Sequence, residues 1–107
     1  MSETALRYNL GKPQWNLVDW DALIPMIRVL MYGATKYSPN NWKKGLTYTS
    51  TMDSLMRHIT AFSKGEDIDP ESGEPHVGHI LCNAMFLSYY YQFMKEFDDR
   101  YLDPNKQ

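Results

Sequence analysis

The sequence HVGHILCNAMFLSYYYQF, residues 76–93, is the longest stretch of the chain with a helical pattern. Its apolar side chains recur at three- and four-residue steps, as on the inward face of an α-helix. They are Val77, Ile80, Leu81 and Ala84. Only Gly78 could weaken the helix between residues 76 and 97, and Pro75 suits the first helical position, where no amide partner is needed. We therefore expect a helix that begins at Pro75 and can continue past Phe93.

Two more helices are predicted on the N-terminal side of this one. Residues 21–36 carry apolar side chains at helical steps, and Pro25 lies early enough in the stretch to be tolerated. A further helix is expected to begin at Ser50 or Thr51, which are both good N-cap residues, and to end before Gly65. The connecting loops are rich in residues that favour turns.

The composition is that of a small folded domain. The 107 residues are 43% hydrophobic and 22% charged, which argues against disorder. We predict an all-α fold, a small helical bundle of three to four helices with long irregular loops. One domain is expected over residues 1–107, with an extended arm at 1–19 and a frayed tail at 99–107. Because so small a core gains from a partner, and because Tyr89-Tyr90-Tyr91 places aromatic rings on several sides of one helix, we expect homo-oligomerisation to complete it.

Charge and hydropathy exclude several classes of function. A net charge of -2 gives no general attraction to phosphate backbones, so we do not expect non-specific nucleic-acid binding. No apolar stretch approaches the roughly 18 residues of a membrane span. The N-terminus has no signal-peptide pattern, and the single Cys82 cannot form an internal disulfide. These features predict a protein of a reducing cytoplasm.

The segment between residues 65 and 75 concentrates negative charge. Five carboxylates fall within nine residues: Glu66, Asp67, Asp69, Glu71 and Glu74. Hard cations such as Mg²⁺ and Mn²⁺ prefer oxygen ligands of this kind, although the EF-hand order of ligands is absent. The alternative is a solvated surface loop, in which Glu71 and Glu74 favour the positive N-terminus of the next helix.

Three histidines flank this acidic segment. On a helix, His76, His79 and Asn83 lie within about 60° of one another and border the apolar face. His58 has a matching position on the preceding helix, so antiparallel packing would bring it close to the pair. Histidines there can ligate a metal, donate to a phosphate or act as general acid or base. Alternatively, they are core-edge residues bonded to backbone or carboxylates.

The loop that follows the first helix mixes aromatic, amide and cationic side chains. Its polar and aromatic members are Lys36, Tyr37, Asn40, Asn41, Trp42, Lys43 and Lys44. Such a mixture suits a nucleotide, with the base on an aromatic ring and phosphate near the ammonium groups. Alternatively, Trp42 is a plug that folds the loop onto the core. Arg57, which precedes His58, can pair with a phosphate or with the acidic loop.

Several motifs, in one order, resemble those of a known family. They are Gly33-Ala-Thr-Lys-Tyr37, Asn41-Trp42-Lys-Lys-Gly45, Arg57-His58, Gly65-Glu-Asp-Ile-Asp69-Pro-Glu71-Ser-Gly73-Glu-Pro-His76, and His79 with Asn83. From about Tyr8 to Tyr90 the chain resembles the N-terminal domain of phage dATP/dGTP diphosphohydrolases. The resemblance implies a purine deoxynucleotide ligand in the host-cell cytoplasm and, in the full-length enzymes, cleavage of a dNTP to dNMP and pyrophosphate. Those enzymes are similar to MazG-like all-α pyrophosphohydrolases, which are oligomers that use Mg²⁺ or Mn²⁺.

The hypothesis of a metal-dependent hydrolase gives each candidate residue a role. Catalysis is assigned to His76, His79 and Glu71, and metal binding to Glu66, Asp69 and Glu71. Nucleotide binding is assigned to Lys36, Tyr37, Asn41, Trp42, Lys44, Arg57, His58 and Asn83. Under this hypothesis one or two divalent ions polarise the phosphoanhydride and activate a water molecule.

Two other functions fit the same residues. The predicted helices carry histidine and asparagine where MazG-like enzymes have paired acids, which favours a binding module without turnover. Such a module would sequester a host nucleotide signal, for example a cyclic nucleotide or an ADP-ribose derivative, and so block antiviral defence. A third hypothesis is a structural or adaptor module whose aromatic side chains serve self-association alone.

Overall fold

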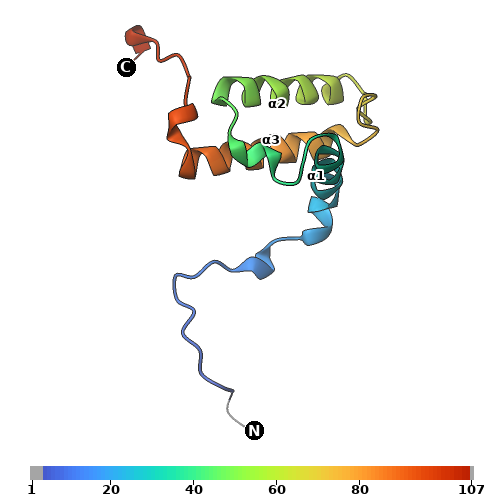
Figure 1. Ribbon diagram of the computed structural model, residues 1–107. Coiled ribbons are helices and arrows are strands. Elements are labelled where there is room, and N and C mark those ends of the chain that lie inside the picture. Colours follow the sequence, from blue (N-terminus) through green and yellow to red (C-terminus); the bar gives the residue numbers. More distant parts are fainter. Residues whose placement is uncertain (1–3, 107) are drawn as a thin grey trace.

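The helix α3 (His76–Phe93) is the element on which the other two α-helices pack. The structure, a computed structural model, describes residues 4–106. Within this range it contains three α-helices, α1 (Ile24–Lys36), α2 (Tyr48–Ser63) and α3, and no strand apart from one isolated bridge between Ile68 and Pro75. The predicted all-α class is therefore confirmed. Figure 1 shows α2 and α3 side by side and antiparallel, with α1 crossing α3 near its start.

Five short 3-10 helices lie within residues 4–106, before, between and after the α-helices. They are η1 (Trp15–Leu17), η2 (Trp20–Leu23), η3 (Asn41–Lys44), η4 (Lys95–Phe97) and η5 (Pro104–Lys106). The predicted arm extends away from the helices in Figure 1, and its first three residues lie outside the described ones. Within the predicted tail, whose residue 107 is also outside, Asp99 accepts a hydrogen bond from the Thr49 amide at 2.9 Å.

Two of the predicted helix starts are displaced by a few residues. The stretch expected to begin a helix at residue 21 is the 3-10 helix η2, and α1 begins at Ile24, with Pro25 in its first turn. Helix α2 begins at Tyr48, earlier than predicted, because Thr47 is its N-cap and accepts a hydrogen bond from the Ser50 amide at 3.3 Å. Sequence alone does not choose between the neighbouring hydroxyl residues that can cap a helix.

Both ends of the long helix also differ from the prediction. Pro75 precedes α3 as its N-cap and is not its first residue. The helix stops at Phe93, because Met94 leaves the helical conformation and the chain turns back toward Gly45. At Gly45 a side chain would come within 2.5 Å of the Phe97 ring, so this turn packs closely against the loop before α2.

Tyr90 connects three parts of the fold. Its side chain is fully buried, its hydroxyl donates to the Trp42 carbonyl at 2.6 Å, and its own carbonyl accepts from the Tyr48 hydroxyl at 3.1 Å. Burial raises the pKa of Tyr90 to about 12, so the hydroxyl keeps its proton and remains a donor. The loop carrying Trp42 and the start of α2 are thereby fixed on α3.

Helices α1 and α3 cross at a glycine. A side chain at Gly78 would come within 2.4 Å of the Pro25 carbonyl oxygen and 2.9 Å of Val29, so only glycine fits there. One turn later the Cys82 thiol donates to the Met26 carbonyl at 3.3 Å. The Cys82 side chain is buried, and this burial raises the pKa of the thiol to about 12.

The apolar core is small for the number of apolar residues. Val29, Tyr48, Cys82 and Tyr90 are the buried apolar residues among those described. Many large apolar side chains are exposed on the arm and on all three α-helices, among them Trp15, Trp20, Met31, Met56 and Tyr91. Their exposure agrees with the expectation that a second copy of the chain covers them. Homo-oligomerisation itself stays a prediction. No helix within residues 4–106 has the length and apolar content to cross a lipid bilayer.

Candidate functional site

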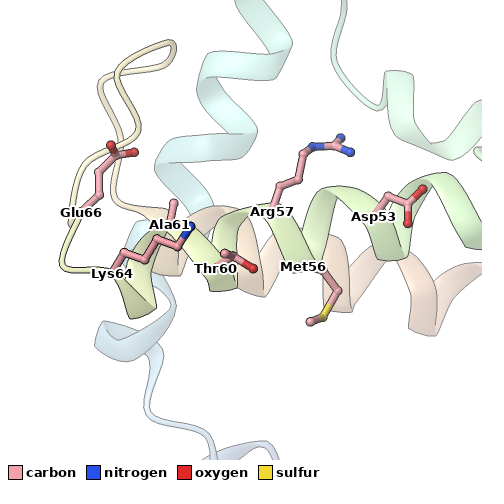
Figure 2. A pocket seen from close by; sticks show the side chains of 7 residues that line it. All are labelled: Asp53, Met56, Arg57, Thr60, Ala61, Lys64 and Glu66. Carbon is pink, nitrogen blue, oxygen red and sulfur yellow. The ribbon is translucent and has the colours of Figure 1, made fainter.

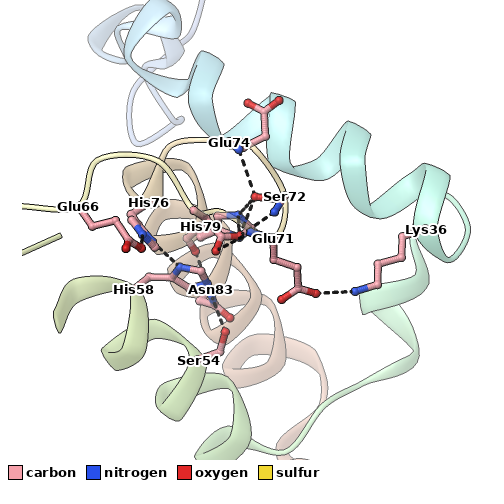
Figure 3. Close-up of polar contacts among 11 residues, drawn as sticks. Lys36, Ser54, His58, Glu66, Glu71, Ser72, Glu74, His76, His79 and Asn83 are labelled. Atoms are coloured by element: carbon pink, nitrogen blue, oxygen red, sulfur yellow. Dashed lines mark hydrogen bonds and ion pairs between the residues drawn. The ribbon is translucent and has the colours of Figure 1, made fainter. Parts of the chain in front are cut away.

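The three histidines meet between α2 and α3. The Nδ1 atoms of His58 and His76 are 2.8 Å apart, and the rings of His58 and His79 stack with centroids 4.2 Å apart and planes inclined by 5° (Figure 3). His58 lies near the end of α2, and His76 and His79 occupy the first turn of α3. Since the two helices are antiparallel neighbours, their adjoining ends bring these rings together. The predicted approach of the histidines is confirmed.

The acidic loop folds back over the histidines. Glu66 Oε1 lies 2.7 Å from His76 Nε2, and Asp69 Oδ2 lies 3.3 Å from His79 Nε2. The main chain holds this shape, because the Asp69 amide donates to the Glu74 carbonyl at 2.9 Å and the His76 amide donates to the Asp67 carbonyl at 2.9 Å. The loop is thus joined to the histidine cluster through carboxylates, as the alternative interpretation of the histidines expects, and the Glu66 side chain stays half exposed.

Ser72 connects the loop to His79. Its hydroxyl donates to Asp69 Oδ2 at 2.8 Å, and its oxygen lies 2.7 Å from His79 Nε2. Because the serine proton is directed to Asp69, the oxygen accepts from the imidazole, and His79 carries its proton on Nε2. Sequence reasoning missed Ser72. The available signal was the Asp-x-x-Ser spacing beside Gly73, which is typical of a side-chain-capped turn.

Burial favours the neutral forms of His58 and His79. Burial lowers the pKa of His58, with a further lowering by the neighbouring His79 and His76 that Asp69 partly offsets. Burial also lowers the pKa of His79. For Asp69, burial alone would raise the pKa, but hydrogen bonds from Ser72 and the Glu71 amide lower it overall. The neutral rings of His58 and His79, beside an ionised Asp69, can accept a proton.

These side chains border a cavity of about 950 Å³ between the three helices and the loop before α2. This volume lies in the range of known small-molecule sites. The cavity is lined by most of the candidate residues: Lys36, Tyr37, Asn41, Trp42, Arg57, His58, Asp69, Glu71, His76, His79 and Asn83. Lys44 and Glu66 are predicted site residues that do not line it.

Asn83 and Ser54 extend the polar wall of the cavity. The Asn83 amide donates to Ser54 Oγ at 3.3 Å and to the His79 carbonyl at 2.9 Å, so the buried amide is satisfied inside the fold. Ser54 is a second residue that sequence reasoning missed. It lies four positions before His58 on α2 and therefore on the same helical face.

The cationic residues at the cavity differ in their partners. Lys36 Nζ lies 3.0 Å from Glu71 Oε1, and the hydrogen bond to that carboxylate raises the pKa of Lys36. Arg57 makes no ion pair within residues 4–106. Arg57 also borders a second hollow of about 680 Å³ on α2, together with Lys64 and Glu66 (Figure 2). Its guanidinium is available to a phosphate from either side.

Trp42 is both an anchor and part of the cavity wall. Its ring stacks on Phe86 with centroids 4.7 Å apart and meets Tyr89 edge-on at 5.0 Å. Lys43 Nζ lies 5.5 Å from the indole centroid. The packing on Phe86 agrees with the plug interpretation, and the indole also lines the cavity. A role in stacking on a nucleotide base stays a prediction.

The three predicted metal ligands have separate partners. Glu66 bonds to His76, Asp69 to Ser72, and Glu71 to Lys36. In Figure 3, Glu66 and Glu71 lie on opposite sides of the histidines. Within residues 4–106 no group of three histidine, cysteine, aspartate or glutamate side chains is arranged to hold a metal ion. The donor set does not fit a resident divalent ion, and the expected use of Mg²⁺ or Mn²⁺ stays a prediction.

Comparison with known proteins agrees with the resemblance seen in the motifs. The model of one sequence family, described as dATP/dGTP diphosphohydrolase, N-terminal, matches residues 2–100. This chain belongs to that family. A dATP/dGTP diphosphohydrolase of Salmonella phage PMBT28 is 31% identical over 97 residues, or 91% of this chain. The match covers 33% of that relative, so the chain spans about a third of its length. No solved structure matches the chain.

Proposed function

We propose that this chain binds a purine deoxynucleoside triphosphate in the cavity and takes part in its hydrolysis to the monophosphate and pyrophosphate. The observation that carries the proposal is the bonded cluster of His58, His76 and His79 on the wall of a cavity large enough for a nucleotide. The name of the phage relative supports the choice of substrate.

The cavity offers a place for each part of the nucleotide. Arg57 and Lys36 can neutralise phosphate oxygens, and the aromatic side of the cavity, with Tyr37 and Trp42, can contact the base. In the proposed reaction a water oxygen attacks the α-phosphorus and the bond to the β-phosphate bridging oxygen breaks. Pyrophosphate leaves, and an imidazole of the cluster takes the proton of the attacking water.

A divalent ion is expected to arrive with the nucleotide as part of the substrate. Mg²⁺ is commonly held by phosphate oxygens and only one or two carboxylates. Asp69 and Glu71 line the cavity and could supply such ligands, although as arranged Asp69 bonds to Ser72 and Glu71 to Lys36. Removal of free divalent ions with EDTA is therefore expected to reduce turnover.

The test incubates the chain with each of the four dNTPs and Mg²⁺ or Mn²⁺ and separates the products. We expect dAMP and dGMP with equimolar pyrophosphate, and little product from the pyrimidine nucleotides. His58→Ala should lower the rate by roughly 10²-fold to 10⁴-fold, as for loss of a general base. The absence of monophosphate at every pH between about 6 and 9 would exclude hydrolysis by this chain.

One observation favours a second candidate function, a binding module without turnover. The carboxylates of Glu66, Asp69 and Glu71 are each bonded to a different side chain, and none is directed at a shared ligand. Such a module would sequester a nucleotide-derived signal of the host, such as a cyclic nucleotide or an ADP-ribose derivative. Recovery of chemically unchanged ligand from heat-denatured complex, with affinity unaffected by EDTA, would support this function.

A further inference from the structure

We propose that Glu66 and His76 act as positioning residues for His58: they hold its proton on Nδ1 and leave Nε2 unprotonated at the cavity. The consequence for catalysis, that His58 Nε2 is the atom which takes the proton of the attacking water, rests on the proposed function. The arrangement of protons itself does not depend on it.

The first step of the argument concerns the pair of Glu66 and His76. His76 is 3% exposed, and its Nε2 lies 2.7 Å from Glu66 Oε1. An ionised carboxylate can only accept hydrogen bonds, so the imidazole must donate. His76 therefore carries a proton on Nε2. The backbone amide of His76 also donates to the Asp67 carbonyl at 2.9 Å, so the main chain that carries the ring is held in place.

The second step concerns the effect of the His76 proton position on His58. A neutral His76 with its proton on Nε2 has an unprotonated Nδ1, which is an acceptor. The Nδ1 of His58 lies 2.8 Å from that atom, so it must donate the hydrogen bond. A neutral His58 then has its lone pair on Nε2. This follows the logic by which a buried carboxylate fixes the tautomer of a catalytic histidine, here through one additional imidazole.

The third step concerns the accessibility of that lone pair. His58 Nε2 makes no hydrogen bond with residues 4–106. No fully buried nitrogen or oxygen atom of a described side chain lacks a partner, so this nitrogen is not fully buried. His58 lines the cavity, and the stacked His79 ring covers one face of it. His58 thus has an unshared lone pair on Nε2, while the stack on His79 and the hydrogen bond to His76 fix the orientation of its ring.

A chain labelled with ¹⁵N at histidine tests the proton positions directly. Two-bond ¹H–¹⁵N spectra at about pH 8 report which nitrogen of each ring carries the proton, and His58→Asn assigns the His58 signals. We expect His58 to be protonated at Nδ1 and His76 at Nε2. A wild-type spectrum in which His58 carries its proton on Nε2 overturns the proposal, and this result needs no variant that could misfold.

A variant and a matched control test the role of Glu66. In Glu66→Ala, His76 loses its acceptor, and we expect His58 to shift to protonation at Nε2. Asp67→Ala removes the same charge from the neighbouring position, where the exposed side chain makes no hydrogen bond within residues 4–106, and should leave the spectrum unchanged. An unchanged His58 tautomer in folded Glu66→Ala contradicts the positioning role.

The kinetic outcome separates this proposal from the proposed function. If the chain hydrolyses dNTPs, Glu66→Ala should lower kcat by about 10²-fold or more with little change in KM, because a wrong histidine tautomer costs the serine-protease triad about 10⁴-fold. Asp67→Ala should retain the rate. If the spectrum shows the expected proton positions but the chain does not hydrolyse dNTPs, the proposed function and the role of His58 as its base are rejected. The assignment of the tautomers would still hold.

Discussion

The imidazole of His58 lies parallel to that of His79, with 4.2 Å between the ring centroids. The two rings come from different helices, and each has its own hydrogen-bond partner, His76 for the first and Ser72 for the second. A proton on either ring would place a positive charge against its neighbour. The stack therefore favours the state in which both rings are neutral.

This relationship predicts how stability depends on pH. Burial, followed by the neighbouring histidines, lowers the pKa of His58, and burial lowers that of His79, from the ordinary 6.5. Below 6.5 the unfolded chain then binds more protons than the folded one, so the free energy of unfolding decreases as pH falls through 6.5 to the folded pKa values. The groups facing His58 are His79, Asp69, His76 and Arg57.

Urea unfolding between about pH 8 and pH 5 measures this dependence. We expect a lower unfolding free energy at pH 5 than at pH 8, and a flatter profile when His58 and His79 are both replaced by Gln. Asp69 does not interfere in this range, because its lowered pKa costs stability only at more acidic pH. A stability that increases steadily from pH 8 to pH 5 would contradict the neutral stack.

Two helical glycines form a matched pair for a test of the helix crossing. Gly78→Ala places a methyl group within 2.4 Å of the Pro25 carbonyl, and we expect a loss of about 1 to 3 kcal/mol in unfolding free energy. Gly33→Ala meets nothing within 4 Å and should stabilise α1 by about 0.5 to 1 kcal/mol. Chemical unfolding of both variants gives the comparison, and equal effects would show that the close crossing does not limit stability.

The pair of Lys36 and Glu71 predicts opposite effects on nucleotide binding. Lys36→Ala removes a cation from the cavity wall and should weaken dATP binding about tenfold, the equivalent of one hydrogen bond to a charged group. Glu71→Gln releases Lys36 and removes a negative charge, so without added metal it should bind dATP as well as wild type or better. Calorimetric titration measures both.

Lys44 serves as the comparison for this prediction. Lys44→Ala removes the same charge from a residue that does not line the cavity, and we expect less than a threefold change in affinity. Weaker binding of Mg²⁺–dATP by Glu71→Gln, together with unchanged binding of dATP alone, would instead identify Glu71 as a ligand of the metal.

Trp42 is predicted to be important for stability as well as for the cavity. Trp42→Ala removes the stack on Phe86 and the edge contact with Tyr89, and should lower the unfolding free energy by about 3 kcal/mol. Trp15→Ala, on the exposed arm, should cost less than about 1 kcal/mol. Thermal or urea unfolding checks both, and similar losses would mean that Trp42 does not anchor its loop.

Local sequence patterns were sufficient for the helices and for the approach of the histidines. Apolar residues at helical steps predicted three helices correctly. The predicted inward face of α3 is wrong in part, because Ala84 is exposed and the buried residues of this helix are His76, Gly78, Cys82, Asn83 and Tyr90. The approach of the histidines was predicted on the condition that α2 and α3 pack antiparallel across the acidic loop, and the structure meets this condition, with His58 and His76 at adjoining ends. The exact helix ends were not specified, since Thr47 and Ser50 can both cap a helix.

The tertiary structure alone determined which groups are bonded to which. No spacing rule indicates that Glu66 bonds to His76 while Glu71 bonds to Lys36, 35 residues away in the sequence. These choices depend on how the loop folds back and where α1 crosses α3 at Gly78, and both are set by packing between distant segments. Periodicity predicts that a helix forms, whereas the face that it buries, the direction of a side chain and its hydrogen-bond partner depend on the three-dimensional surroundings.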